Sequence, residues 1–125
     1  MRKILVVDDE HDICEFVSNF FRERGYEVFA ALNGDEALSI VRKEKPELVL
    51  LDIKMKGMDG IAALKHIKSL DRNINVIMVT ALEDVDKMNE ASRLGASDYI
   101  TKPLELDHLE QAVEKSLKTH GDFIK

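Results

Sequence analysis

The stretch Lys3-Ile-Leu-Val-Val-Asp-Asp-Glu10 joins four consecutive apolar residues to three consecutive acids. A short run of large and β-branched apolar residues, bounded by charge, is typical of a strand buried on both faces of a parallel sheet. Similar runs predict further strands at residues 28–31, 48–51 and 76–79, with a shorter one at 98–101. Each strand of this kind has to be covered by other elements on both sides.

Apolar residues between these runs recur with helical spacing, at i, i+3, i+4 and i+7. The pattern continues near residues 37–41, 61–67 and 106–117, is weakest near 85–91, and is strongest at Ile13, Phe16, Val17, Phe20 and Phe21. We expect the three phenylalanines of that set to pack in the core. Strict alternation of strands and helices forces a parallel sheet with right-handed crossovers. The sequence therefore predicts an α/β fold of (βα)5 type, a doubly wound five-stranded parallel sheet of order 2-1-3-4-5 with flavodoxin-like topology.

Length and composition exclude several classes of protein. The 125 residues suit one domain, which we place at residues 1–120 with a C-terminal tail at 121–125. A net charge of −6, from 24 acidic and 18 basic residues, argues against direct binding of nucleic acid. The longest apolar run, residues 28–32, is far short of the ~20 residues that span a membrane, and the run at 4–7 is too short for a signal peptide. We therefore expect a cytoplasmic protein with no membrane contact.

Polar side chains follow the ends of the predicted strands. Asp8 and Asp9 come after the first strand and Asp52 after the third. Because ligands of open parallel sheets bind at the carboxyl ends of the strands, we expect these carboxylates to meet there. Clustered carboxylates raise one another's pKa values, and a hard divalent cation such as Mg²⁺ would relieve the repulsion. Taken without Asp52, the pair Asp8 and Asp9 could equally end a strand and cap a helix.

Two further strand ends carry groups suited to a phosphoryl group. Thr80 ends the fourth strand and offers a hydroxyl donor, and Lys102 follows the fifth strand with a mobile positive charge. An aspartate can act as the nucleophile in phosphoryl transfer and form an aspartyl phosphate. Together with a metal ion, these groups are what a phosphoryl group attached at Asp52 would require.

Five segments of the sequence carry a resemblance to a known family. In chain order they are Lys3 to Glu10, Leu50-Leu-Asp-Ile-Lys-Met-Lys-Gly-Met-Asp-Gly60, Val79-Thr-Ala81, Gly95-Ala-Ser-Asp-Tyr99 and Thr101-Lys-Pro-Leu104. Over essentially its whole length the chain resembles a receiver domain of the bacterial two-component response regulators. The resemblance implies that Asp52 accepts a phosphoryl group from a phosphohistidine of a histidine kinase or of a phosphotransfer protein.

The same resemblance implies a role for each residue of the site. Asp9 and Asp52 would bind Mg²⁺ with their carboxylates, Lys54 with its backbone carbonyl, and Asp8 through a metal-bound water. Thr80 and Lys102 would contact the phosphoryl oxygens, and Tyr99 would turn inward when Thr80 moves toward the phosphate. Pro103 is a candidate for a cis peptide bond.

The resemblance also implies a signalling domain that promotes only its own phosphorylation and dephosphorylation and is not otherwise an enzyme. Its phosphorylation would change a surface made of the fourth helix, the fifth strand and the fifth helix, for a protein effector or a second copy of the chain. The sequence departs from the family at Lys56, where proline is common. Two rivals share the fold plan: a flavodoxin-like electron carrier, whose FMN phosphate would meet Asp8 and Asp9, and an aspartate-nucleophile phosphatase, whose nucleophile usually follows the first strand.

Overall fold

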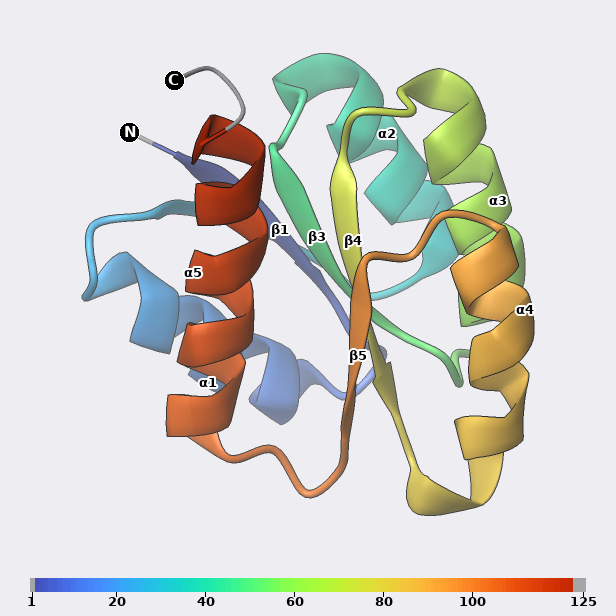
Figure 1. Ribbon diagram of the computed structural model, residues 1–125. Coiled ribbons are helices and arrows are strands. Elements are labelled where there is room, and N and C mark those ends of the chain that lie inside the picture. Colours follow the sequence, from blue (N-terminus) through green and yellow to red (C-terminus); the bar gives the residue numbers. More distant parts are fainter. Residues whose placement is uncertain (1, 123–125) are drawn as a thin grey trace.

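A parallel β-sheet lies in the middle of the molecule, between two layers of helices (Figure 1). The computed structural model describes residues 2–122. The five strands lie in the order β2-β1-β3-β4-β5, and every neighbouring pair is parallel, which confirms the predicted topology. The strands are β1 (Lys3–Val7), β2 (Glu27–Ala31), β3 (Leu48–Asp52), β4 (Asn75–Thr80) and β5 (Asp98–Thr101).

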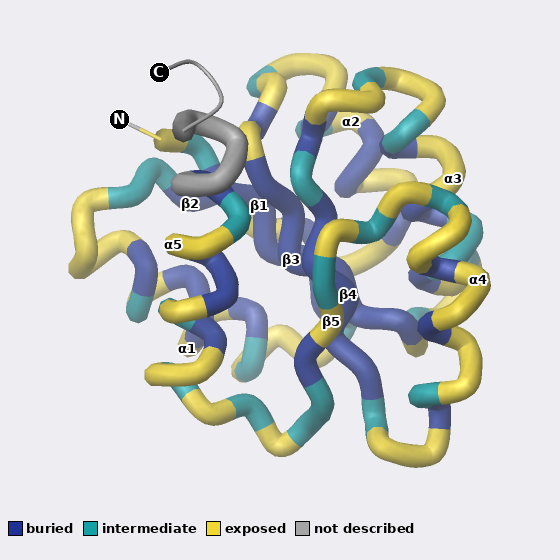
Figure 2. Tube along the Cα trace, in the orientation of Figure 1, coloured by how far each residue is buried: buried dark blue, intermediate teal, exposed yellow. Residues whose placement is uncertain are grey.

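The helices divide between the two faces of the sheet. On one face lie α1 (His11–Arg22) and α5 (Leu106–Asp122), and on the other lie α2 (Gly34–Glu44), α3 (Gly60–Leu70) and α4 (Met88–Arg93) (Figure 1). Each face has its own apolar core, and all five residues of the central strand β3 are buried. Figure 2 shows the buried strands enclosed by helices whose outer sides are exposed. The short apolar runs of the sequence form strands because both of their faces are covered.

Side-chain caps fix where two of the helices begin. Asn33 accepts a hydrogen bond from the backbone N–H of Glu36 at 2.8 Å, and Asp59 accepts one from that of Ala62 at 2.8 Å. Such caps satisfy N–H groups that have no partner within the helix. They set the first turns of α2 and α3, and the first turn of α3 lies next to the functional end of the sheet.

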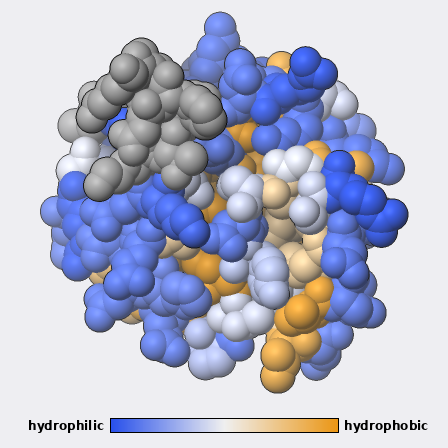
Figure 3. Space-filling model, viewed as in Figure 1, coloured by the Kyte–Doolittle hydropathy of each residue, from blue (hydrophilic) through white to orange (hydrophobic). Residues whose placement is uncertain are grey.

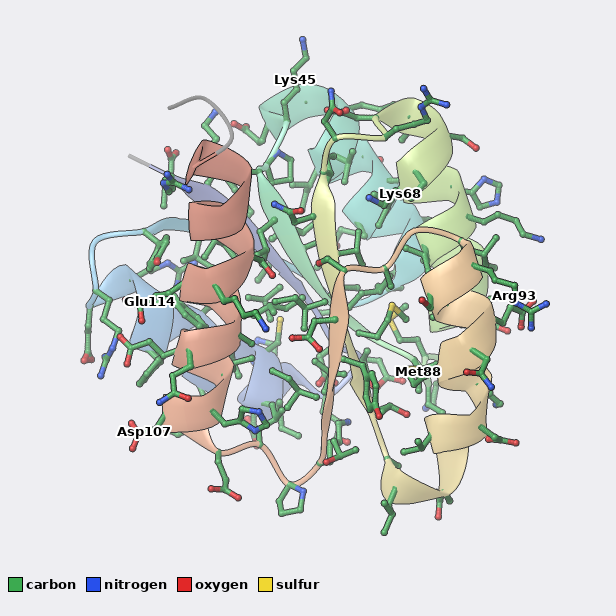
Figure 4. The ribbon with its side chains drawn as sticks, viewed as in Figure 1. Lys45, Lys68, Met88, Arg93, Asp107 and Glu114 are labelled. Atoms are coloured by element: carbon green, nitrogen blue, oxygen red, sulfur yellow. The ribbon has the colours of Figure 1, made fainter. Side chains whose placement is uncertain are left out.

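The segment after β4 is less regular than the predicted fourth helix. Residues Leu82–Lys87 form a 3₁₀ helix, η1, and the α-helix itself begins only at Met88. Figure 4 shows Met88 on the side of α4 that faces the sheet and Arg93 on its outer side. Within α4 only Met88 and Ala91 are buried, so few apolar contacts hold this element.

The buried side of α1 differs from the prediction at one residue. The helix buries Cys14, Val17, Ser18 and Phe21, whereas Phe16 is 59 % exposed, so its expected place in the core was wrong. Phe16 fits the apolar spacing, but it lies at the outer edge of a narrower buried stripe. Phe20 is partly buried under the Arg24 guanidinium, which lies 3.6 Å from the ring centroid.

The last helix extends further than the sequence pattern indicated. Helical spacing of apolar residues was seen only over residues 106–117, but α5 continues to Asp122, because a glycine such as Gly121 weakens a helix without necessarily ending it. Of the tail predicted at 121–125, residues 123–125 lie outside the described residues, and the division into domain and tail stays a prediction. Among residues 2–122, the helices are all too short or too polar to cross a membrane.

Candidate functional site

The residues singled out in the sequence lie at the carboxyl ends of four neighbouring strands, at the lower end of the sheet in Figure 1. Asp8 directly follows β1 and Asp52 is the last residue of β3, and the register pairs Val7 with Leu51. Thr80 ends β4 and Lys102 directly follows β5. The parallel topology alone therefore brings these four side chains to one edge of the sheet.

Three carboxylates form a compact cluster at this edge. One oxygen from each of Asp8, Asp9 and Asp52 lies within 4.8 Å of the others. Asp8 and Asp52 are only 4 % and 3 % exposed, whereas Asp9 lies closer to solvent. Backbone N–H groups hold two of the acids, since Glu10 donates to Asp8 Oδ1 at 2.9 Å and Lys56 donates to Asp9 Oδ2 at 3.3 Å.

Lys102 brings a positive charge to the cluster. Its Nζ lies 3.2 Å from Asp52 Oδ2, to which it donates a hydrogen bond, and 3.9 Å from Asp8 Oδ2. The peptide bond between Lys102 and Pro103 is cis. One ammonium group thus faces two buried carboxylates, with a third close by.

The pKa values of these groups reflect their burial first and the neighbouring charges second. Burial raises the pKa of Asp8 to about 6, against the hydrogen bond from Glu10, and the charge of Asp52 adds to the increase. Burial also raises the pKa of Asp52, although Lys102 acts in the opposite direction. Burial works against the charged form of Lys102, but the carboxylates of Asp52 and Asp8 outweigh it and raise the pKa of this lysine. Loss of water is therefore the main cause of the raised acid pKa values, and repulsion between the carboxylates comes second.

The donor set fits a hard divalent cation. All three side chains offer carboxylate oxygens, and the cluster carries three acids against the single ammonium group of Lys102. Hard cations such as Mg²⁺ prefer oxygen ligands and commonly use one or two carboxylates. The role assigned to the Lys54 carbonyl stays a prediction.

The two residues of the expected switch, Thr80 and Tyr99, differ in how far they are buried. Thr80 is fully buried, and its hydroxyl donates to the carbonyl of the next residue, Ala81, at 3.1 Å. Tyr99 pairs in register with Met78 and is 44 % exposed, so its ring is outward in this state. Thr80 pairs in register with Thr101, which places the end of β4 beside the end of β5.

One feature beside the site was missed by the sequence reasoning. Lys54, two residues after Asp52, lies 3.2 Å from Glu83 and 3.4 Å from Asp84, and Asp84 also pairs with Lys87 at 3.4 Å. Asp84 is only 6 % exposed, so η1 carries a buried acid that ties it to the loop after β3. The adjacent acids Glu83 and Asp84, which begin three residues after the end of β4, with Lys87 three residues after Asp84, were the signal available in the sequence.

Comparisons with known proteins agree with this geometry. The sequence model of the family described as "Response regulator receiver domain" matches residues 4–114. The chain is 47 % identical over 115 residues to the sporulation initiation phosphotransferase F of Bacillus subtilis (strain 168), covering 92 % of this chain and 93 % of that protein. It is 45 % identical over 119 residues to the transcriptional regulatory protein ZraR of Escherichia coli (strain K12), covering 94 % of this chain but only 27 % of that longer protein.

Solved structures are similar over nearly the whole chain. The receiver domain of NtrX from Brucella abortus has a TM-score of 0.88 and 37 % identity, covering 93 % of this chain and 98 % of that one. A CheY-like response regulator receiver domain protein from Methanospirillum hungatei JF-1 has a TM-score of 0.93 and 29 % identity, covering 98 % of both chains.

Proposed function

Since the chain belongs to the family of response regulator receiver domains, the signalling domains of two-component systems, we propose that Asp52 is its phosphoacceptor. The observation that carries this proposal is the contact of Lys102 Nζ with Asp52 Oδ2 at 3.2 Å, inside a cluster of buried carboxylates. The donor would be a phosphohistidine of a histidine kinase or of a phosphotransfer protein. Like other members of the family, the domain would work in the cytoplasm.

The transfer forms one bond and breaks one. An Oδ atom of Asp52 attacks the phosphorus, and the P–N bond of the phosphohistidine breaks as the new O–P bond forms. The electron pair of the broken bond returns to the imidazole nitrogen, which takes up a proton. Asp52 has to be ionised to attack, and the adjacent ammonium group of Lys102 favours that form.

Lys102 and Thr80 are proposed to hold the transferred group. The lysine has a mobile ammonium group at the cluster, where it can bind a phosphoryl oxygen as it now binds Asp52. The Thr80 hydroxyl donates only to the carbonyl of its neighbour Ala81, so it can turn to another acceptor at the cost of one hydrogen bond. Both groups would stabilise negative charge as it develops on the phosphoryl oxygens.

Asp8, Asp9, Asp52 and the backbone carbonyl of Lys54 are proposed to hold Mg²⁺, with Asp8 acting through a bound water. When bound, Mg²⁺ would supply a Lewis acid that neutralises charge on the phosphoryl oxygens. The site itself thus supplies the groups for transfer, and we expect the domain to promote its own phosphorylation and dephosphorylation but no other reaction.

The output of the domain is proposed to be a change in the surface formed by α4, β5 and α5. Tyr99 would turn inward as Thr80 moves toward the phosphoryl group. A groove of about 530 Å³ runs between α4 and β5, lined by Met88, Ala91 and Tyr99 among others. Figure 3 shows weakly polar and apolar surface over this region, between more hydrophilic helices. The partner would be a protein effector or a second copy of the chain.

Intact-mass measurement tests the proposal. With Mg²⁺ and a small phosphoramidate or acyl phosphate donor, the protein should gain one phosphoryl group, since the catalytic groups lie in the domain itself. Asp52→Asn should remain unlabelled, and a chelator should suppress labelling of the wild type. Equal labelling of Asp52→Asn and wild type would exclude Asp52 as the acceptor.

A further inference from the structure

The first residue of α3, Gly60, lies directly against the backbone of the residue proposed as the acceptor. A Cβ atom on Gly60 would lie 2.4 Å from the carbonyl oxygen of Asp52 and 2.5 Å from the Cα atom of Ile53. Non-bonded heavy atoms of this kind normally stay about 3.5 Å apart or more. Both neighbours are backbone atoms, so neither can swing aside as the end of a long side chain can.

The backbone after Asp52 is held from two sides. Gly60 N–H donates to the Ile53 carbonyl at 2.8 Å, and Ile53 N–H donates to the Val79 carbonyl of β4 at 2.9 Å. A side chain at position 60 would displace the backbone of residues 52 and 53, or it would push α3 away. Because Ile53 N–H donates to the carbonyl of Val79, which directly precedes Thr80, a displacement of Ile53 also acts on a residue proposed to bind the phosphoryl group.

We propose that Gly60 is a positioning residue for phosphoryl transfer, and that the absence of its side chain sets the place of the Asp52 carboxylate relative to Lys102 and Thr80. This inference rests on the proposed role of Asp52 as the phosphoacceptor. Relieving the overlap requires a displacement of roughly 1 Å. A misplacement of about 1 Å can slow a reaction by about 100-fold. Gly60 itself does not touch the reacting groups.

The cap of α3 contributes to the same positioning. Asp59 accepts a hydrogen bond from Ala62 N–H at 2.8 Å and so fixes the turn that places Gly60 against the acceptor backbone. Asn33 makes the equivalent bond to Glu36 N–H at 2.8 Å at the start of α2. The two caps are alike in geometry, but only the first lies in the turn that touches Asp52.

The first experiment compares Gly60→Ala with Gly25→Ala by the initial rate of phosphorylation with phosphoramidate and Mg²⁺, measured by intact mass. Gly25 has a φ of +91° and open space around its Cα, so alanine there strains the backbone without an overlap. We expect Gly60→Ala to lower the maximum rate by about tenfold to 100-fold with the half-saturating donor concentration unchanged, and Gly25→Ala to stay within about twofold of wild type. Circular dichroism under the same conditions confirms that each variant is folded.

A second series covers the case in which Gly60→Ala does not fold. Asp59→Ala should lower the maximum rate severalfold, whereas Asp59→Asn, which keeps the cap, and Asn33→Ala, which removes the equivalent cap of α2, should not. Equal rates for Gly60→Ala and wild type, or for Asp59→Ala and Asn33→Ala, would overturn the inference. If wild type itself is not labelled on Asp52, the proposed function fails first, and the inference falls with it.

Discussion

Replacing Asp8 with asparagine should stabilise the metal-free protein at neutral pH. Asp8 is 4 % exposed, and burial raises its pKa to about 6 from an ordinary value of 3.8. Asparagine has nearly the same shape, and its Oδ1 can keep the hydrogen bond from the backbone N–H of Glu10. The substitution therefore removes a buried charge and leaves the local geometry in place.

The sign and size of the effect follow from the raised pKa. A carboxyl group whose pKa is raised in the folded state stabilises the fold fully below pH 3.8, and this contribution is lost as the pH rises through about 6. The full shift of about 2 units corresponds to about 3 kcal/mol, of which about 2 kcal/mol should be lost between pH 4.5 and 7.5. Asparagine does not titrate, so the advantage of Asp8→Asn over wild type should grow by about 2 kcal/mol across this range.

Urea denaturation followed by circular dichroism measures this difference. Both proteins are unfolded in the presence of a chelator at a series of pH values from 4.5 to 7.5, and the free energies of unfolding are extrapolated to water. Glu114→Gln is the matched control, because Glu114 lies exposed on the outer side of α5 (Figure 4) and loses the same charge. Its difference from wild type should stay nearly constant over the same range.

A constant difference between Asp8→Asn and wild type across pH 4.5–7.5 would refute the reasoning. It would mean that Asp8 is not desolvated enough to raise its pKa. A difference that grows equally for Glu114→Gln would assign the effect to the overall charge of −6 instead of the site.

Three further outcomes are expected. Mg²⁺ should raise the melting temperature in step with RT ln(1 + [Mg²⁺]/Kd), and Asp9→Ala should remove that increase in the same thermal scan. Phe21→Ala should lower the free energy of unfolding by about 3–5 kcal/mol because the Phe21 side chain is fully buried. Phe16 is 59 % exposed, so Phe16→Ala should change the free energy of unfolding by about 0.5 kcal/mol or less. Urea denaturation measures both differences. Phosphorylation should change hydrogen exchange within residues 84–106, and a change confined to the loop after β3 would exclude the proposed switch.

The fold could be predicted because each local signal agreed with the others. Four apolar runs of strand length alternated with helical spacing, and this alternation permits few topologies once crossovers are right-handed. The weak apolar pattern at 85–91 correctly marked the least regular element, where η1 precedes the short α4. Spacing could not place Phe16, because an apolar residue at the edge of a stripe fits the pattern whether or not a neighbour covers it.

The meeting of the acids could be predicted for the same reason, because parallel strands bring their carboxyl ends to one edge. The extent to which these acids are buried could not be predicted from the sequence. Repulsion was the expected cause of the raised acid pKa values, yet burial contributes more for both Asp8 and Asp52. Burial depends on how β-strands and helices close around the edge, and the sequence pattern contains no measure of that. The ion pairs of Lys54 with Glu83 and Asp84 join segments 29 and 30 residues apart, and the adjacent acids in the sequence indicated a charged segment there but not its partner.

The balance of charge at this end of the sheet suggests why phosphorylation of Asp52 would also affect residues outside the site. At rest, three carboxylates face the single ammonium group of Lys102. In the proposed reaction Asp52 exchanges its single negative charge for a phosphoryl group of nearly two, so the excess of negative charge grows where water is already largely excluded. Burial makes that excess costly, and an uncharged donor at the same end of the sheet, the Thr80 hydroxyl, now bonds only its neighbouring carbonyl. Thr80 ends the strand that leads through η1 into α4. Among the described parts of the α-helices, α4 has the fewest buried residues, so a movement that relieves the charge at Asp52 would act first on the helix that resists it least.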